Sequence, residues 1–564
     1  MNRPNHPEGA NLANSGADAF RPEATRADAS SASAEADEAG HASIKHRGIL
    51  ITGLIIAMLF GALDQTIVGT AMPRIVGELG GLAYMAWLTT AYMLTSTTVV
   101  PIAGKLADLL GRRVVYVTGL AIFMIGSALC GAAHTMNQLI FFRGFQGIGG
   151  GIMMPMAMVI IGDLFTGAER AKWQGVFGAI FGLSSIVGPQ IGGWIVDALS
   201  WRWVFYINLP IALIAIVFIS MGLHSHRRSE RVTFDIAGIV TMVVGVVSLL
   251  LALTFGGKDY PWTSWQILGL FAIALVSLTA FVVIEARAAE PILPLRLFRN
   301  RTFVLINGIG FLMSVGMFGS IMFIPLFLQG IIGISPSASG TAMTPMMLTV
   351  MAGSMVGGRL VTKIGVRTQT TIGMLIMAVS FILLAHLTVH TKTLAVTGCM
   401  IILGIGMGLV MPLLTIALQE SFPRTELGVV TSSSQFFRQI GGTFGMTILG
   451  AMLNARSSAL LTAQLDPLLQ RIPANPMVAQ LKSMIATNAQ GLYSSLLNPN
   501  ALAQMPAVFR GTLVPVLKSA LVESLHSVFW FGLVFILLGV VCSLFLGKIR
   551  ISSRRGARPA PSEA

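Results

Sequence analysis

Successive apolar stretches, each long enough to cross a lipid bilayer, constrain this chain more than any other feature of its sequence. A helix of about 20 apolar residues spans the hydrocarbon core of a membrane. Of the 564 residues, 54% are hydrophobic and 11% are charged, whereas soluble domains carry about 25% charged residues. The sequence therefore predicts an all-α membrane protein with many transmembrane helices.

Fourteen such stretches are predicted along the chain. They begin near Gly48, Leu82, Val114, Met136, Trp173, Trp203, Ile236, Trp265, Phe303, Ser339, Thr368, Thr393, Leu427 and Ser527. Lys and Arg collect on the cytoplasmic side of membrane proteins. With the N-terminus placed inside, basic residues crowd the predicted inner loops, and the short outer loops hold only Arg74, Arg202, Lys258 and Lys392. The net charge of +14 is therefore assigned to inner loops rather than to nucleic-acid binding, and both ends are predicted to be cytoplasmic.

The apolar pattern divides the chain into five predicted segments. Residues 1–46 are rich in Ala, Ser, Asp and Glu and lack the apolar core of a signal peptide, so we expect a disordered cytoplasmic tail. Residues 47–224 form a first six-helix bundle, 225–290 two inserted helices, and 291–547 a second six-helix bundle. Residues 548–564 are a basic cytoplasmic tail.

The second bundle contains a long outer segment at about residues 454–524. Its moderately apolar sequence predicts two or three short amphipathic helices that form an extracytoplasmic cap, and a loose loop is the alternative.

A faint internal repeat supports two related bundles. "GKLADLLGRR" at 104–113 is similar to "GRLVTKIGVR" at 358–367, and "PQIGGWI" at 189–195 is similar to "RQIGGTF" at 438–444. The two offsets, 254 and 249, agree closely. Duplicated halves are common in secondary transporters.

Three charged residues fall well inside predicted spans: Asp64, Arg143 and Arg438. A charge at the centre of a bilayer costs at least about 2.5 kcal/mol, so such residues usually face a cavity or a partner. Asp64 and Arg143 are predicted at the same depth, roughly 10–12 Å below the outer surface. A pair that exchanges protons is one interpretation, and a purely structural ion pair is the other. For Arg438, the alternatives are backbone carbonyls, neighbouring glutamines or a partner in the first bundle.

Several motifs resemble those of the major facilitator superfamily. "GKLADLLGRRV" at 104–114 resembles its loop motif between the second and third helices, and "RGFQGIGGG" at 143–151 its fourth-helix motif. "GLSSIVGPQIGGWI" at 182–195 looks like the fifth-helix motif of its antiporters. Four more segments resemble the fourteen-helix drug:proton antiporters of the EmrB/QacA type: "LDQTIVGTAMP" (63–73), "WRWVFYINLP" (201–210), "LPLRLFRNRTF" (293–303) and "HSVFWFGLVF" (526–535). The resemblance covers about residues 48 to 550.

The resemblance implies roles position by position. Asp64 matches the first-helix carboxylate of proton or cation handling, and Arg143 the fourth-helix arginine of proton transfer. The inner-loop gating motif is matched by Gly104, Asp108, Gly111, Arg112 and Arg113. The antiporter motif is matched by Gly182, Gly188, Pro189, Gly192 and Gly193.

The chain also departs from the family pattern. Gly69 stands where many relatives have Asn, and the last six predicted spans hold no acidic residue. These departures argue against multi-proton coupling and against a strong preference for dicationic drugs.

The residues themselves support part of this reading. Asp108, near the end of its span, can face helix N-termini or Arg112 and so hold one conformation by charge, and a solvated loop acid is the alternative. Glycines about four residues apart in the fifth span allow close helix contact. Pro189 removes a backbone hydrogen bond and favours a bend.

The predicted function is proton-coupled efflux of lipophilic or cationic compounds by alternating access. Met is adaptable, and aromatic faces attract cations. The 31 Met and 31 Phe residues would therefore suit a promiscuous central cavity. The polar or aromatic candidates for its lining are Gln65, Trp87, Tyr92, Gln146, Gln435 and Arg438. A different cargo on the same fold is the alternative: a lipid, siderophore, amino acid or other metabolite.

Other classes of protein fit less well. The fifth-helix glycine pattern argues against a symporter or facilitator. An enzyme is disfavoured because the sequence has no paired acids, no HExxH motif and no Cys/His cluster, and Cys130, Cys399 and Cys542 give no metal or disulfide spacing. We expect a monomer in the bacterial cytoplasmic (inner) membrane that uses the proton gradient and no cofactor. A periplasmic adaptor and an outer-membrane channel are conceivable partners.

Overall fold

The computed structural model describes residues 47–79, 85–165, 167–223, 235–257, 260–469, 507–547 and 549. Apart from an isolated bridge between Gly256 and Tyr260, every regular element in these ranges is helical. The two predicted tails, 1–46 and 548–564, lie outside the described residues except for Ile549. The prediction of an all-α protein is confirmed.

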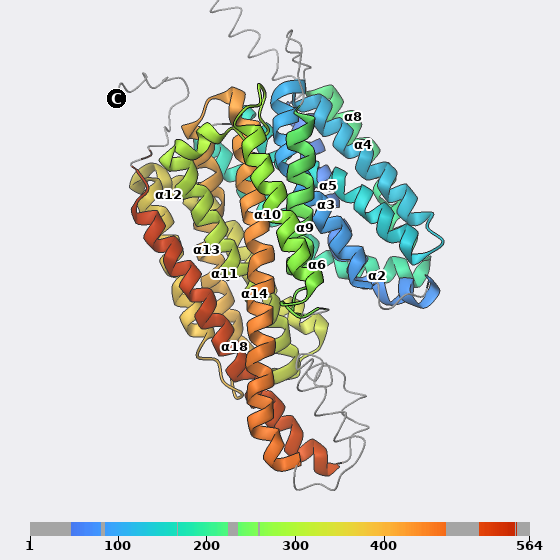
Figure 1. Ribbon diagram of the computed structural model, residues 1–564, viewed down its shortest axis with the longest axis vertical. Helices are drawn as coiled ribbons and strands as arrows, with labels where there is room; N and C mark the ends of the chain where they lie inside the picture. The colour runs from blue at the N-terminus through green and yellow to red at the C-terminus, as the bar shows by residue number, and fades with distance from the viewer. Residues whose placement is uncertain are drawn as a thin grey trace, which may run out of the picture.

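The helices follow the predicted order (Figure 1). The N-terminal half consists of α2 (Arg47–Leu79), α3 (Met85–Leu110), α4 (Arg112–Gly131), α5 (Met136–Leu164), α6 (Gly167–Ala198), α7 (Trp203–Tyr206) and α8 (Asn208–Gly222). The inserted pair is α9 (Ile236–Phe255) and α10 (Trp265–Glu285). The C-terminal half consists of η3 (Leu295–Arg299), α11 (Arg301–Phe327), η4 (Leu328–Ile332), α12 (Pro336–Leu384), α13 (Thr393–Ser421), η5 (Arg424–Glu426), α14 (Leu427–Leu469) and α18 (Ala507–Leu544).

Ten helices in the described ranges are long and apolar enough to cross a membrane, with α12 counted once. The long helices α3, α6 and α14 are not included in these ten and lie among them. Since α12 is broken at Gly365, each of the fourteen predicted spans corresponds to one of these helical segments. The chain is a multi-pass membrane protein.

Two glycines at matching positions of the repeat have the same unusual backbone. Gly111 joins α3 to α4 with φ 89° and ψ 150°, and Gly365 breaks α12 with φ 79° and ψ 164°. L-residues rarely adopt a positive φ of this kind, whereas glycine does so at little cost. The predicted repeat between 104–113 and 358–367 therefore encodes the same sharp helix–helix corner in both halves.

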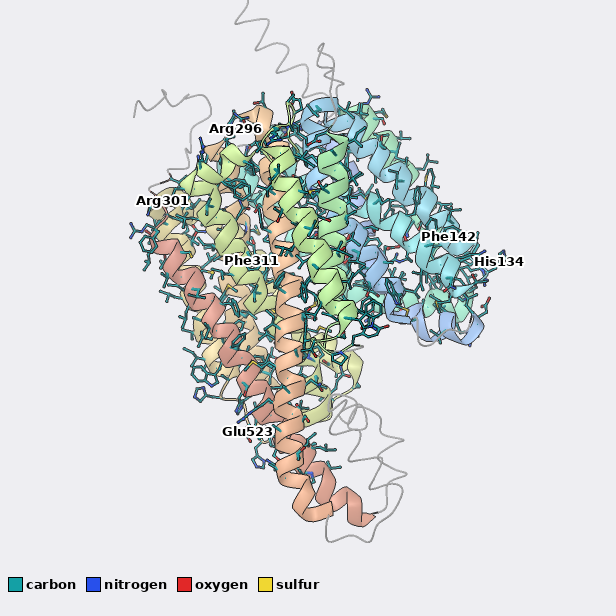
Figure 2. All side chains as sticks on the ribbon, in the orientation of Figure 1. His134, Phe142, Arg296, Arg301, Phe311 and Glu523 are labelled. Atoms are coloured by element: carbon teal, nitrogen blue, oxygen red, sulfur yellow. The ribbon has the colours of Figure 1, made fainter. Side chains whose placement is uncertain are left out.

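The two halves meet closely at one end of the molecule. We call this the basic end; it is where α3 ends at Leu110 and α14 begins at Leu427. Arg296 and Arg301 lie there, and His134 and Glu523 lie towards the opposite end (Figure 2). From the basic end the N-terminal half leans away from the C-terminal half (Figure 1). The inserted pair lies between the halves, and α9 contacts both α3 and α14.

At the opposite end of the N-terminal half, Glu78 near the end of α2 binds two residues of the loop that follows α6. Its carboxylate accepts hydrogen bonds from the Arg202 guanidinium and, at 2.8 Å, from Trp201 Nε1. These bonds, with the positive charge of Arg202, lower the pKa of Glu78. The loop between α6 and α7 is thereby tied to α2.

Only the two ends of the predicted outer segment at 454–524 belong to the described residues. Helix α14 continues without interruption to Leu469, and α18 already begins at Ala507. Residues 454–469 and 507–524 are therefore extensions of the neighbouring long helices rather than separate short helices or a loose loop. Figure 1 shows them projecting beyond the rest of the bundle. Residues 470–506 lie outside the described residues.

Glycines in α5 let its backbone lie directly against the backbones of the neighbouring helices α3 and α4. A Cβ added at Gly149 would lie 2.4 Å from the Phe123 nitrogen of α4, and one at Gly151 would lie 2.3 Å from the Ser96 oxygen of α3. Such small-residue contacts replace the hydrophobic effect as the basis of helix association in lipid. They place the polar side chains of α5 in the centre of the N-terminal half.

We predict that Gly149→Ala lowers the stability of the protein by about 1–3 kcal/mol, because the added methyl group overpacks a backbone contact. Gly308→Ala on α11 is the matched control, since its Cβ would meet nothing within 4 Å. That substitution should leave stability unchanged or raise it by up to about 1 kcal/mol. Thermal unfolding of the purified variants in detergent measures both, and equal shifts would contradict the packing argument.

Candidate functional site

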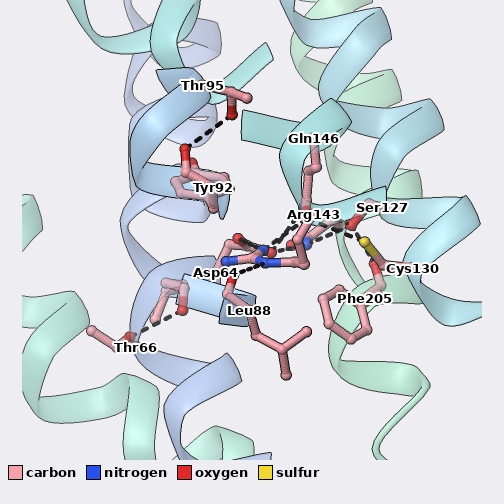
Figure 3. Close-up of polar contacts among 12 residues, drawn as sticks. Asp64, Thr66, Leu88, Tyr92, Thr95, Ser127, Cys130, Arg143, Gln146 and Phe205 are labelled. Carbon is pink, nitrogen blue, oxygen red and sulfur yellow. Dashed lines mark hydrogen bonds and ion pairs between the residues drawn. The ribbon is translucent and has the colours of Figure 1, made fainter. Parts of the chain in front are cut away.

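The centre of the N-terminal half holds an ion pair between α2 and α5. Arg143 Nη1 lies 2.7 Å from Asp64 Oδ2, and the two residues are 2% and 1% exposed. Figure 3 shows the Arg143 side chain reaching from its helix to Asp64. The predicted contact between these two residues is thus present.

Two neutral amides, one on α5 and one on α8, complete the coordination of the Asp64 carboxylate. Gln146 Nε2 and Asn208 Nδ2 donate to its Oδ1 at 3.0 and 2.9 Å. Both amides also donate to Ser127 Oγ of α4, at 3.2 and 2.9 Å. Arg143 Nη1 donates to Gln146 Oε1 at 2.7 Å. Buried charges are tolerated only with such dense hydrogen bonding.

Aromatic rings cover the guanidinium of Arg143. Its Cζ atom lies 4.4 Å from the centre of the Tyr92 ring and 5.9 Å from that of Phe205. Cations are attracted to aromatic faces, most strongly where water is excluded. A Cβ added at Gly150 would lie 2.1 Å from the Tyr92 hydroxyl, so a larger side chain there would displace the ring.

The pair is closed off in this conformation. Tyr92 and Gln65 line a small cavity of about 60 Å³, which also reaches Gln439 of the C-terminal half. Asp64 does not line it, because the Tyr92 side chain, 3% exposed, covers the pair. The Asp64 carboxylate is therefore shielded from this cavity.

Asn208 and Ser127 belong to this site, although the sequence gave no reason to select them. Asn208 lies in "WRWVFYINLP", a segment that stood out only through its family resemblance. The available signal was an amide at the first residue of an apolar helix. Ser127 is one of many small polar residues in the spans, and nothing in its sequence context distinguishes it.

Residues of the predicted gating motif close the basic end. Asp108 accepts hydrogen bonds from the Gly428 and Val429 nitrogens at the start of α14, at 3.1 and 2.8 Å, and from Arg112. A carboxylate at a helix N-terminus is stabilised by the helix dipole. A Cβ added at Gly104 would lie 2.0 Å from Ser432 Oγ, so α3 and α14 touch here. Gly111 makes the corner between α3 and α4, and Arg113 is half-buried at the start of α4.

Further contacts across the basic end join the two halves. Arg170 of α6 pairs with Glu420 of α13 at 2.9 Å. Gln419 Nε2 donates to the Met158 oxygen of α5 at 3.2 Å. Lys105 of α3 pairs with Glu290, in the segment after the inserted helices, at 2.6 Å.

The glycines of the predicted antiporter motif serve two interfaces. A Cβ added at Gly188 or Gly192 would lie 2.0 or 2.2 Å from the hydroxyls of Thr66 and Thr70 on α2. One at Gly182 would lie 2.8 Å from Met347 Cβ of α12, across the halves. Gly193 has open space beside it. The side chain of Pro189 lies outside the described residues, and its predicted bend stays a prediction.

A cavity of about 600 Å³ lies between α3, α9, α11 and α14. None of the six predicted lining residues borders it. Gln65 and Tyr92 line the small cavity, Trp87 packs against Phe255 with the rings tilted and their centres 5.1 Å apart, and Gln146 is buried in the Asp64 network. Gln435 contacts Met154 across the halves and accepts a hydrogen bond from Arg438, whose Nη1 also donates to Thr415 Oγ1 at 3.4 Å. The six residues that were predicted to line one central cavity therefore lie in several different places.

Residues 54–446 match the family model of the Major Facilitator Superfamily. The chain belongs to the Major Facilitator Superfamily. It is accordingly a membrane transporter and not an enzyme. The two related halves of this fold account for the matching corner glycines at 111 and 365.

Relatives within the superfamily cover nearly the whole chain. It is 64% identical to the multidrug transporter protein MdtP of Bacillus subtilis, over 90% of this chain and 94% of that protein. It is 37% identical to multidrug resistance protein 3 of the same organism, over 89% and 96%. Among solved structures, the human organic anion transporter MFSD10 has a TM-score of 0.54 at 13% identity, covering 86% of this chain and 99% of that one. The proton:xylose symporter XylE has a TM-score of 0.53 at 11% identity, covering 81% and 97%.

We predict that Arg143→Met destabilises the transporter by about 3–5 kcal/mol, because it leaves the Asp64 carboxylate buried without its counter-charge. The double variant Asp64→Asn with Arg143→Met removes both charges and should be clearly more stable than Arg143→Met alone. Thermal unfolding in detergent compares the two. A double variant no more stable than the single one would show that charge pairing is not what Arg143 contributes.

Proposed function

We propose that this transporter exports lipophilic and cationic small molecules in exchange for protons, by alternating access. The observation that carries the proposal is a carboxylate buried at mid-bundle and paired with Arg143. Two relatives that cover nearly the full chain are named as a multidrug transporter and a multidrug resistance protein, which supports the substrate class. The gradient supplies the energy, without a cofactor.

The proposed orientation puts the basic end in the cytoplasm. Lys105, Arg112, Arg170 and Arg296 all lie at this end, and basic residues favour the cytoplasmic side. The protein would then reside in the cytoplasmic membrane with both ends of the chain inside. In this conformation the cytoplasmic side is closed, and the large cavity lies towards the outside.

Coupling follows from the electrostatics of the pair. While Asp64 is ionised, its attraction to Arg143 holds α2 against α5. A proton arriving from outside neutralises the carboxylate and removes this attraction, so that Arg143 is held only by neutral groups and by the Tyr92 ring. The conformation that opens the basic end then becomes easier to reach, and the proton is released to the cytoplasm as substrate binds. A ligand can shift such an equilibrium only through its different affinity for the two states.

We expect Asp64→Asn to abolish substrate-driven proton release. Everted membrane vesicles are loaded with a dye that reports internal pH, and ethidium is added as the cationic substrate. The amide cannot carry the exchanged proton, so the variant should give no dequenching. Glu78→Gln is the matched control, since it makes the same chemical change on the same helix outside the pair, and it should retain dequenching. Unchanged dequenching by Asp64→Asn would refute the assignment.

We also expect Asp108→Ala to loosen the closed basic end. Ser432 is fully buried against Gly104. It is replaced by Cys in the wild type and in Asp108→Ala, so that the reactivity of the thiol reports exposure of the basic end. Loss of a carboxylate at a helix N-terminus costs about 1 kcal/mol, which corresponds to about fivefold more of the open state. Alkylation of the reporter by a water-soluble maleimide should accelerate to that extent. The control is Asp197→Ala, since Asp197 is exposed on α6. Equal alkylation rates in Asp108→Ala and Asp197→Ala would contradict the role of Asp108 in holding the basic end closed.

A further inference from the structure

We propose that the cavity between α3, α9, α11 and α14 is a binding site for uncharged lipophilic compounds, with the inserted helix α9 as one wall. This inference rests on the proposed export function and narrows the substrate class for this site. With a volume of about 600 Å³, the cavity falls within the range of about 300–1,000 Å³ typical of drug-sized ligands.

The chemistry of the lining favours a neutral ligand. Methionines such as Met322 and Met446, together with Phe323, supply adaptable apolar surface, and Thr254 and Thr443 add hydroxyl groups. The residues described as lining the cavity include no Asp, Glu, Lys or Arg. A cation entering it would lose water without gaining a counter-charge, which is unfavourable. An uncharged molecule with one or two hydrogen-bonding groups meets no such penalty.

Helix α9 is fixed against both halves where it borders the cavity. Phe255 at its end packs against Trp87 of α3, with the rings tilted and their centres 5.1 Å apart. The Leu253 oxygen accepts a hydrogen bond from Thr447 Oγ1 of α14 at 3.2 Å. Helix α9 therefore bridges the two halves at the end where they diverge, and it lines the cavity on one side.

Helix α3 connects this cavity to the ion pair. Thr90, Met93, Leu94 and Thr97 line the cavity, and their spacing puts them on one stripe of the helix. Tyr92 points to a different side of α3, where it covers Arg143. A ligand that displaces α3 from the cavity side would therefore move the ring that shields Asp64. This gives an uncharged substrate a route to proton exchange without contact with the carboxylate.

The test fills the cavity from the α9 side. Thr254→Trp projects an indole into the space. Thr254→Val replaces only the hydroxyl by a methyl group of similar size, so it tests the site even if the larger variant misfolds. Val244→Trp is the control, because Val244 is 41% exposed on the same helix and lies outside the lining. Everted vesicles are challenged with Nile Red as the uncharged probe and ethidium as the cationic probe, and proton release is recorded.

Thr254→Trp should reduce proton release driven by Nile Red at least about tenfold, since misfit groups in an apolar pocket change discrimination by about 10- to 200-fold. Thr254→Val should reduce it by up to about fivefold, the usual worth of one hydrogen bond. Ethidium-driven release and all responses of Val244→Trp should match wild type. Undiminished Nile Red transport by Thr254→Trp would overturn the site. Equal loss of both dyes would overturn its restriction to uncharged compounds.

A binding measurement separates this inference from the proposed function. Nile Red that co-elutes with the purified full-length protein in detergent is quantified for wild type, Thr254→Trp and Val244→Trp, without any proton gradient. If wild type and Val244→Trp retain the dye and Thr254→Trp does not, the site stands even where no proton release is seen, and only the coupling fails. Equal retention by all three variants would overturn the site whatever the vesicles show.

Discussion

An ion pair buried among apolar helices is the interaction on which the N-terminal half depends. Asp64 comes from α2, Arg143 and Gln146 from α5, Ser127 from α4 and Asn208 from α8, while α3 supplies the covering ring of Tyr92. In lipid there is no hydrophobic effect to hold helices together. A network that satisfies a carboxylate therefore ties five helices into one unit, and the same carboxylate is the group whose neutralisation would loosen that unit.

The C-terminal half is built differently. Among the described residues, Arg438 has hydrogen bonds from its guanidinium only to neutral oxygens of Gln435 and Thr415. The two halves therefore differ in electrostatics although they share the corner glycines at 111 and 365. Between them, contacts concentrate at the basic end, through Asp108 and Arg170. The opposite end is bridged by α9 instead. This helix lines the cavity that lies between the two halves where they diverge.

Much of this architecture could be predicted from the residues. The apolar stretches predicted where the helices lie. The repeat that begins at 104 and 358 predicted related positions in the two halves, and both of them form the same sharp helix–helix corner. The rarity of charge in the spans singled out Asp64 and Arg143, because a charge in lipid needs a partner. The extent of α14 and α18 could not be predicted in this way, since the amphipathic stretches after 454 and before 524 are compatible with short separate helices as well as with continuations. The lining of the large cavity could not be predicted either, since it is formed by methionines and threonines of ordinary apolar spans, which no sequence feature distinguishes.

The sequence by itself determined the membrane class, the order of the helices and the three charges within the spans that had to find partners. These features follow from local free energies: transfer of apolar residues into lipid and the high cost of an isolated charge there. Only the tertiary structure decided that Asn208 and Ser127 share the carboxylate, that Tyr92 separates it from the nearest cavity, and that α9 forms a wall of the larger one. These depend on which faces of distant helices meet, and one-dimensional spacing does not specify rotation of a helix about its axis when nearly every face is apolar.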